Sequence, residues 1–187
     1  MAEHVVLFAG PMGSGKTTAI RSLSEIEVVS TEAANTDRAT ADKETTTVAL
    51  DYGEITIDDV TKVRLYGVPG QKRFDFMWSI LAGRARGLLL LINNDAPESI
   101  ALLLQYLADF HELHARGAVV IGVTKSDVRE SPTVADYSAA LTAKFPEQLI
   151  PVFTVDPRNA EEMRTLLLTL VASVEMRELL APAPEKI

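Results

Sequence analysis

The fold of this chain is decided by one stretch, Gly10-Pro11-Met12-Gly13-Ser14-Gly15-Lys16-Thr17. It fills every fixed position of the pattern G-x-x-x-x-G-K-[ST], a glycine-rich loop whose backbone N–H groups wrap around a di- or triphosphate. An apolar run at residues 5–9 precedes it, and a helix-compatible run at residues 18–23 follows it. Few chance matches have a strand before and a helix after, so the stretch predicts a phosphate-binding loop rather than an ordinary glycine loop.

Each part of this loop has a role in holding a nucleoside polyphosphate. The backbone N–H groups of the stretch and of Thr18 would surround the phosphates, and the positive N-terminal end of the following helix would attract them. The Lys16 ammonium would reach the β- and γ-phosphates, and the Thr17 hydroxyl would be a ligand of Mg²⁺.

Composition indicates one globular domain over residues 1–187. Of the 187 residues, 47% are hydrophobic and 24% are charged, which is enough for one sizeable core and short for two. The formal net charge of −8 disfavours nucleic acid as the principal partner, because a phosphate backbone needs a cationic face. The chain has no cysteine, so disulfides, thiolate metal sites and prenylation are excluded.

The sequence gives no sign of direct membrane insertion. Its first four residues, MAEH, have neither the basic start of a signal peptide nor a myristoylation glycine. The longest apolar runs, such as residues 88–92, are far too short to span a bilayer. We therefore expect a cytoplasmic protein that would reach a membrane only through a partner, with residues 181–187 as a frayed tail.

Apolar and helical segments alternate, which predicts an α/β fold with helices on both faces of a mainly parallel sheet. The expected strands cover residues 4–9, 48–57, 60–68, 87–92, 118–123 and 150–153. The expected helices cover residues 16–25, 74–81, 97–116, 134–145 and 159–180. The second and third strands form an antiparallel hairpin, so we expect a six-stranded mixed sheet (five parallel, one antiparallel) flanked by five helices in three layers.

Two loops carry side chains suited to the γ-phosphate end of a nucleotide. After the third strand stands GVPGQ, in which Gly70 would offer its N–H to the γ-phosphate and Gln71 would orient the attacking water. Before the hairpin, a polar loop over residues 30–46 leads into a run of threonines that ends at Thr47, and one hydroxyl there can close on Mg²⁺. Taken alone, Pro-Gly is a turn signal and threonine is common where a strand begins.

A third loop, after the fifth strand, carries Thr124, Lys125, Ser126 and Asp127. The Asp127 carboxylate can accept two parallel hydrogen bonds from guanine N1–H and the 2-amino group, a pair of donors that adenine lacks. The stem of Lys125 can lie along the purine plane. A lone T-K-x-D is weak, but here it follows the appropriate strand of a chain with a phosphate-binding loop.

In this order the motifs resemble the Ras-like small GTPase superfamily of P-loop proteins over nearly the whole chain. The closest likeness is to Arf-like and bacterial MglA-type proteins, because TVAL at residues 47–50 is similar to the Arf-type switch I. Gln71 followed by Trp78 is similar to the Arf-type switch II. The resemblance implies GTP/GDP and Mg²⁺ as cofactors, and it assigns roles as follows: Thr17 and Thr47 as metal ligands, Gln71 and Lys16 in catalysis, Lys125 and Asp127 as guanine readers.

The chain departs from the family pattern at three places. Gly67 stands where switch II usually has the aspartate that supports the Mg²⁺ hydration shell. MglA-type proteins are similar to this chain in lacking that aspartate. Asp51 lies nearby in the preceding strand and could in principle compensate, but we do not expect it to, because the sequence does not fix its direction. Thr124 stands where asparagine is commoner. The usual Ser-Ala-Lys after the last strand is poorly matched by TVD at residues 154–156, from which we expect backbone contacts at most.

The sequence therefore predicts a bacterial switch GTPase that acts in polarity, motility or signalling. Hydrolysis would be slow without a partner, and the resemblance implies a roadblock-domain activator besides an unknown effector. Arg38 and Arg73 lie in the two expected switch loops, where either could be an internal arginine finger or a solvated surface residue. The alternatives are a scaffold that binds GTP or GDP with little hydrolysis and a P-loop kinase, which would need an arginine-bearing lid that we do not find.

Overall fold

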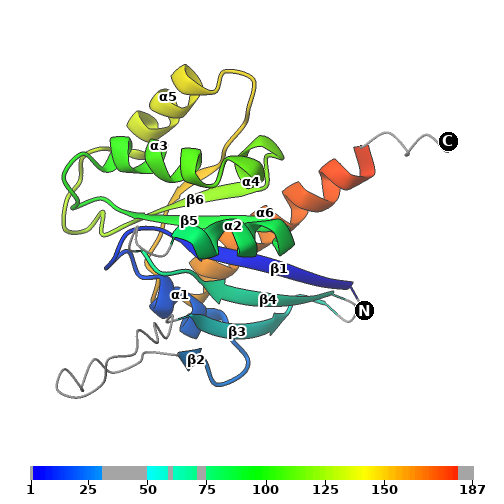
Figure 1. Cartoon of the computed structure of the whole chain (residues 1–187). Helices are drawn as coiled ribbons and strands as arrows, with labels where there is room; N and C mark the ends of the chain where they lie inside the picture. The colour runs from blue at the N-terminus through cyan, green and yellow to red at the C-terminus, as the bar shows by residue number, and fades with distance from the viewer. Residues whose placement is uncertain (1, 31–49, 59–60, 71–74, 181–187) are drawn as a thin grey trace, which may run out of the picture.

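The structure is a computed structural model that describes residues 2–30, 50–58, 61–70 and 75–180. Its centre is one seven-stranded sheet with strand order β2-β3-β4-β1-β5-β6-β7 (Figure 1). The strands are β1 (Ala2–Ala9), β2 (Val29–Ser30), β3 (Asp51–Thr56), β4 (Thr61–Gly67), β5 (Gly87–Asn93), β6 (Val119–Thr124) and β7 (Val152–Thr154). Strands β4, β1, β5, β6 and β7 pair in parallel, whereas β3 is antiparallel to both of its neighbours.

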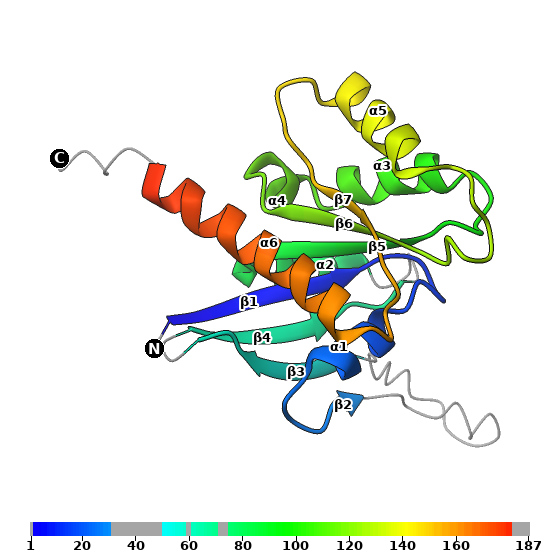
Figure 2. The same cartoon turned by 180° about the vertical axis from the view of Figure 1, so that it is seen from behind.

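Helices cover both faces of the sheet, because successive side chains of its central strands point to opposite sides. In β1, Leu7 packs into one core and Phe8 into the other. One face is covered by α2 (Asp75–Arg84), α3 (Ser99–Asp109), α4 (His111–Ala115) and α5 (Val134–Lys144). The other face, turned to the viewer in Figure 2, is covered by α1 (Lys16–Leu23) and α6 (Ala160–Leu180). No helix of the described chain is both long and apolar enough to cross a bilayer.

The expected α/β fold is confirmed, but the expected six strands and five helices are too few: the described residues form seven strands and six helices. The added strand β2 pairs with the edge of β3. With only two residues, β2 is too short to show any periodicity in the sequence. The expected helix 97–116 is divided at Phe110, whose ring is buried against Trp78. Gly117, with φ 63°, follows α4 as expected for a residue that ends a helix.

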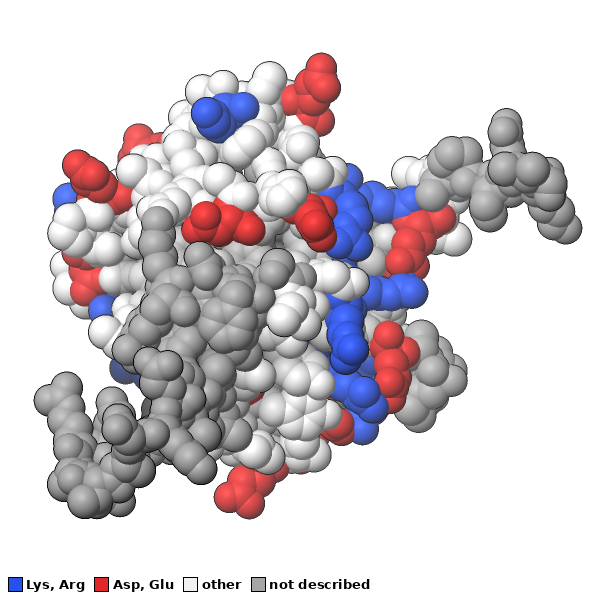
Figure 3. Space-filling model, viewed as in Figure 1, with Lys and Arg blue, Asp and Glu red and all other residues white. Residues whose placement is uncertain are grey.

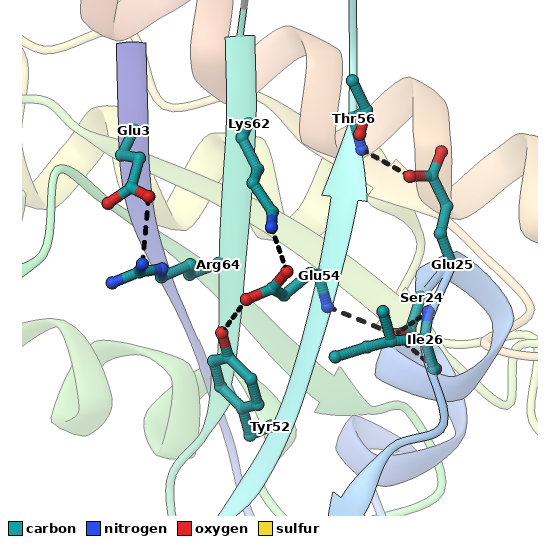
Figure 4. Close-up of polar contacts among 9 residues, drawn as sticks. All are labelled: Glu3, Ser24, Glu25, Ile26, Tyr52, Glu54, Thr56, Lys62 and Arg64. Atoms are coloured by element: carbon teal, nitrogen blue, oxygen red, sulfur yellow. Dashed lines mark hydrogen bonds and ion pairs between the residues drawn. The ribbon is translucent and has the colours of Figure 1, made fainter. Parts of the chain in front are cut away.

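Polar contacts hold the antiparallel hairpin of β3 and β4 against the end of α1 (Figure 4). The Glu25 carboxylate accepts a hydrogen bond from the Thr56 N–H at 3.0 Å, and the Ser24 hydroxyl accepts one from the Glu54 N–H at 3.2 Å. On the other face of β3, the Glu54 carboxylate forms an ion pair with Lys62 of β4. These contacts fix the position of β3, whose first residue is Asp51, relative to α1.

Charged side chains on the face shown in Figure 3 gather near the start of β1 and the end of α6, with both signs side by side. Arg86 contacts Glu178 of α6 at 2.5 Å, and Arg64 of β4 contacts Glu3 of β1 at 2.9 Å. Exposed pairs of this kind contribute little to stability. In each of these two pairs a basic side chain has an acidic neighbour.

We expect Tyr137→Phe to lower the free energy of unfolding by about 1–3 kcal/mol, because it leaves a buried acceptor unsatisfied. The Tyr137 hydroxyl is fully buried and lies 2.8 Å from Asn94 Oδ1 and 2.7 Å from Ser99 Oγ. Urea unfolding would measure the loss. Tyr52→Phe is the control, because that hydroxyl bonds Glu54 at a partly exposed site where water can replace it. Equal losses in the two variants would contradict the prediction.

Candidate functional site

The loops that follow β1, β5, β6 and β7 meet at one edge of the sheet, where parallel strands end. They line a cavity of about 770 Å³. Its walls come from the phosphate-binding loop, from Asp95 after β5, from residues 124–128 after β6 and from residues 154–158 after β7. The structure thus brings the Gly-rich motif and the T-K-x-D motif, more than a hundred residues apart in sequence, into one cavity.

The phosphate-binding loop needs its glycines because of their backbone conformation and, at Gly10 and Gly15, because neighbouring atoms lie very close. Gly10, Gly13 and Gly15 all have positive φ, at 138°, 80° and 95°. A Cβ on Gly10 would lie 2.0 Å from the Leu91 carbonyl oxygen, and a Cβ on Gly15 would lie 2.5 Å from Pro157 Cγ. No side chain caps the start of α1, so its first N–H groups remain for a ligand or water.

Lys16 lies under this loop. Its ammonium donates hydrogen bonds to the carbonyl oxygens of Gly10 and Pro11, both at 2.8 Å. Burial lowers the pKa of Lys16 to about 8, and the opposing attraction of Asp51 is too weak to restore it. The loop therefore holds a buried ammonium group, whose positive charge a neighbouring phosphate would stabilise.

Thr17 lies next to a carboxylate. Its hydroxyl donates to Asp51 Oδ2 at 2.5 Å, and the Ser30 hydroxyl donates to Asp51 Oδ1 at 2.6 Å. Sequence reasoning left the direction of Asp51 open; the structure turns it toward the start of α1. No group of three or more His, Cys, Asp or Glu side chains forms a metal site within the described ranges. A few hard oxygen donors are typical of a Mg²⁺ that keeps waters and binds substrate phosphates.

The described part of the loop after β4 packs directly on the phosphate-binding loop. A Cβ on Gly70 would lie 2.6 Å from the Gly10 carbonyl oxygen, so only glycine fits there. The Tyr106 hydroxyl donates to the Gly70 carbonyl at 3.1 Å, and Trp78 Nε1 donates to the Pro69 carbonyl at 3.1 Å. The Trp78 ring, 3% exposed, stacks on Tyr106 and Phe110 with centroid distances of 5.6 and 5.2 Å.

The T-K-x-D segment is tied to the phosphate-binding loop by Thr124. Its buried hydroxyl donates to the Ser14 carbonyl at 3.2 Å. Lys125 has a left-handed backbone, with φ 59°, and its ammonium contacts Asp95 Oδ2 at 3.1 Å. A hydrogen bond from Asn93 and then this ammonium lower the pKa of Asp95. Asp127 is exposed and lines the cavity.

The loop after β7 also forms part of the cavity wall, and the backbone contacts to the base expected of it stay a prediction. Pro157 packs on Gly15, and Arg158 lines the cavity while it pairs with Asp156 at 2.7 Å. Hydrogen bonds from Arg158 lower the pKa of Asp156 to about 2. Sequence reasoning also missed Asp95 and Tyr106, because a lone Asp after a strand and a Tyr in a helix carry no pattern.

Four predicted residues lie outside the described residues: Thr47, Gln71, Arg38 and Arg73. Their assigned roles stay predictions. The other predicted site residues, from Gly10 to Thr18, Gly70, Thr124, Lys125 and Asp127, lie around the same edge of the sheet.

Comparison with known proteins places this geometry among nucleotide-binding folds. A family model described as "conserved hypothetical ATP binding protein" matches residues 26–179. An uncharacterized protein of Methanocaldococcus jannaschii, MJ1339, is 43% identical over 63 residues, which cover 30% of this chain and 40% of that protein. The human ADP-ribosylation factor-like protein 5A is 26% identical over 141 residues, 74% of this chain and 71% of that protein.

The structure is also similar to solved small GTPases. The Arl6 small GTPase of Trypanosoma brucei, solved with the nucleotide analogue GppNp, superposes with a TM-score of 0.69. The alignment covers 94% of this chain and 99% of that one at 14% identity, so it shows the fold alone. The predicted likeness to the Ras-like superfamily is confirmed.

We expect affinity for GDP to fall about fourfold between pH 7 and pH 8.5, because the Lys16 pKa near 8 lets the unbound ammonium lose its proton over this range. A bound phosphate would raise that pKa, so binding would take up a proton. Calorimetric titrations at several pH values would measure the effect. Lys16→Arg should bind more weakly but without this pH dependence, since arginine stays charged. A flat profile for the unchanged protein would contradict a Lys16 pKa near 8 in the unbound site.

Proposed function

The chain belongs to the family described as conserved hypothetical ATP binding protein and has the fold of small GTPases, and from this premise we propose that it is a GTP-hydrolysing molecular switch. The observation that carries the proposal is the shared cavity of the phosphate-binding loop and the T-K-x-D segment. The Thr124 hydroxyl, bonded to the Ser14 carbonyl, fixes the distance between the two. A nucleotide would place its phosphates on one and its base on the other.

Guanine is the base that this cavity favours, although the family description speaks of ATP. Asp127 lines the cavity, and a carboxylate there would pair with the two adjacent donors of guanine. With adenine the carboxylate would lose both partners. Lys125 would hold either purine, because its stem can lie along the purine plane while its ammonium contacts Asp95.

Mg²⁺ fits the residues beside Lys16. The Thr17 hydroxyl, with the Asp51 carboxylate next to it, supplies the hard oxygens that this ion prefers, and Thr47 would join them in the GTP state. When bound, the ion would neutralise charge on the β- and γ-phosphates. All protein donors named here are oxygen atoms, which matches magnesium better than zinc or copper.

The reaction would be in-line attack of water on the γ-phosphorus. Lys16 and the N–H groups of the phosphate-binding loop would stabilise the charge that develops, and Gln71 would position the water. The Gly70 N–H would hold the γ-phosphate, because Gly70 packs on the phosphate-binding loop. Unassisted turnover would be slow, at ~10⁻⁴–10⁻² s⁻¹.

Slow turnover implies partners. We infer an activator of the roadblock-domain class and an effector that reads the loops around residues 30–47 and 67–78. A role in bacterial polarity, motility or signalling, and one catalytic domain over residues 1–187, belong to the same proposal.

A second candidate is a scaffold that holds GTP or GDP and barely hydrolyses it. Gly67 favours it, because no side chain at that position can support a metal ion. Gln71 opposes it. Single-turnover hydrolysis, measured with and without a roadblock-domain protein, separates the two candidates.

We expect Asp127→Ala to weaken GTP binding about a hundredfold and ATP binding less than threefold, because only guanine loses two hydrogen bonds to a charged acceptor. Competition against a fluorescent nucleotide would measure both affinities. Glu130→Ala is the charge-matched control, since Glu130 is exposed in the same loop outside the cavity wall. Equal weakening of GTP and ATP would rule out base reading by Asp127.

We expect Gln71→Leu to lower the rate of GTP hydrolysis at least tenfold with GTP affinity nearly unchanged, because the water would lose its positioning group but the phosphates would keep theirs. Single-turnover assays would give the rate, and equilibrium binding of the same variant would give the affinity. An unchanged rate would remove Gln71 from this role.

A further inference from the structure

Asp51 and Gly67 are directly opposed across the hairpin. The register of β3 and β4 pairs these two residues. A Cβ on Gly67 would lie 3.1 Å from Asp51 Cβ and 3.1 Å from Asp51 Oδ2. The Asp51 carboxylate therefore occupies the space that a side chain at position 67 would enter.

The Asp51 carboxylate is aimed at the phosphate-binding end of α1. One oxygen accepts from Thr17 and the other from Ser30, at 2.5 and 2.6 Å. It also attracts the Lys16 ammonium, as the opposing effect on the Lys16 pKa shows. Contacts of Ser24 and Glu25 with β3 hold the strand in this position.

The direction of the Thr17 hydrogen bond matters for a metal. Thr17 donates its hydrogen to Asp51, so the lone pairs of the Thr17 oxygen stay free. A neighbouring carboxylate that accepts from a metal ligand fixes the orientation of that ligand and increases its basicity. The same carboxylate would add a negative charge beside a bound Mg²⁺ ion.

We propose that Asp51 is the carboxylate that supports Mg²⁺ in this protein, moved from β4 to the neighbouring strand β3. This inference rests on the proposed function, since it needs a bound nucleotide and its metal. It also explains how the site functions with glycine at position 67. The rival view, that Asp51 only joins β3 to α1, gives the carboxylate charge no part in metal binding.

The first test measures release of a fluorescent GDP (N-methylanthraniloyl-GDP) at graded free Mg²⁺. Bound metal slows release, so the midpoint of the curve reports metal affinity. Asp51→Asn keeps the shape of the side chain and removes its charge, and it should raise the midpoint at least tenfold. Release in excess EDTA should stay within twofold of the unchanged protein, because no metal is bound there.

Glu54→Gln is the matched control. It removes one carboxylate charge from the same strand, on the opposite face, where Glu54 pairs with Lys62. Its midpoint should equal that of the unchanged protein. If the Mg²⁺ midpoint of Asp51→Asn also equals that of the unchanged protein, the inference is overturned. If the rate of GDP release from the unchanged protein does not depend on Mg²⁺, or if the protein does not bind GDP at all, the proposed function is overturned as well.

The second test returns the carboxylate to β4. Asp51→Gly combined with Gly67→Asp should bring the Mg²⁺ midpoint within about threefold of the unchanged protein, whereas Asp51→Gly alone should not. The Ile20 δ-methyl, 2.9 Å from a Cβ at position 67, can turn away. If the double variant folds but has the same Mg²⁺ midpoint as Asp51→Gly alone, the proposed move of the carboxylate from β4 to β3 is contradicted. Should the double variant not fold, Asp51→Asn decides the question alone.

Discussion

Close packing of three neighbouring segments against the phosphate-binding loop is the constraint on which the site depends. The loop after β1 is touched by the end of β5, by the loop after β4 and by the loop after β7. At each contact a Cβ would collide, with Leu91 at Gly10, with Pro157 at Gly15 and with the Gly10 carbonyl at Gly70. Glycines of both loops therefore meet the same kind of steric requirement, each at a contact that leaves no room for a Cβ.

Two side-chain contacts keep this packing in register. The Thr124 hydroxyl joins the base side of the cavity to the phosphate-binding loop, and the Tyr106 hydroxyl joins α3 to the Gly70 carbonyl. Trp78, stacked between Tyr106 and Phe110, also donates to the Pro69 carbonyl. A change in the position of Gly70 and the adjacent Pro69 would therefore move their hydrogen-bonded partners in α3 and α2. These contacts link the phosphate end of the site directly to the outer helices.

Sequence alone predicts most of this arrangement where a repeating pattern or a fixed motif exists. Central strands such as β5 follow from unbroken apolar runs, and the order of motifs places their loops at one edge. Strand β2 could not be predicted, because two residues carry no period and their pairing depends on β3. Phe110, where the helix breaks, packs against the Trp78 ring, a tertiary contact that helical spacing does not contain.

Two of the three departures from the family pattern show why motif positions and positions in space must be kept apart. Asp51 approaches from the strand opposite Gly67, so an antiparallel partner can supply a carboxylate that a linear motif records as lost. Thr124 is shorter than the commoner asparagine, yet its hydroxyl still reaches the Ser14 carbonyl. The Asp51 carboxylate comes from a neighbouring strand, whereas Thr124 makes its contact with its own side chain. Loss of a motif residue therefore predicts loss of its chemistry only when no adjacent strand can present the same group.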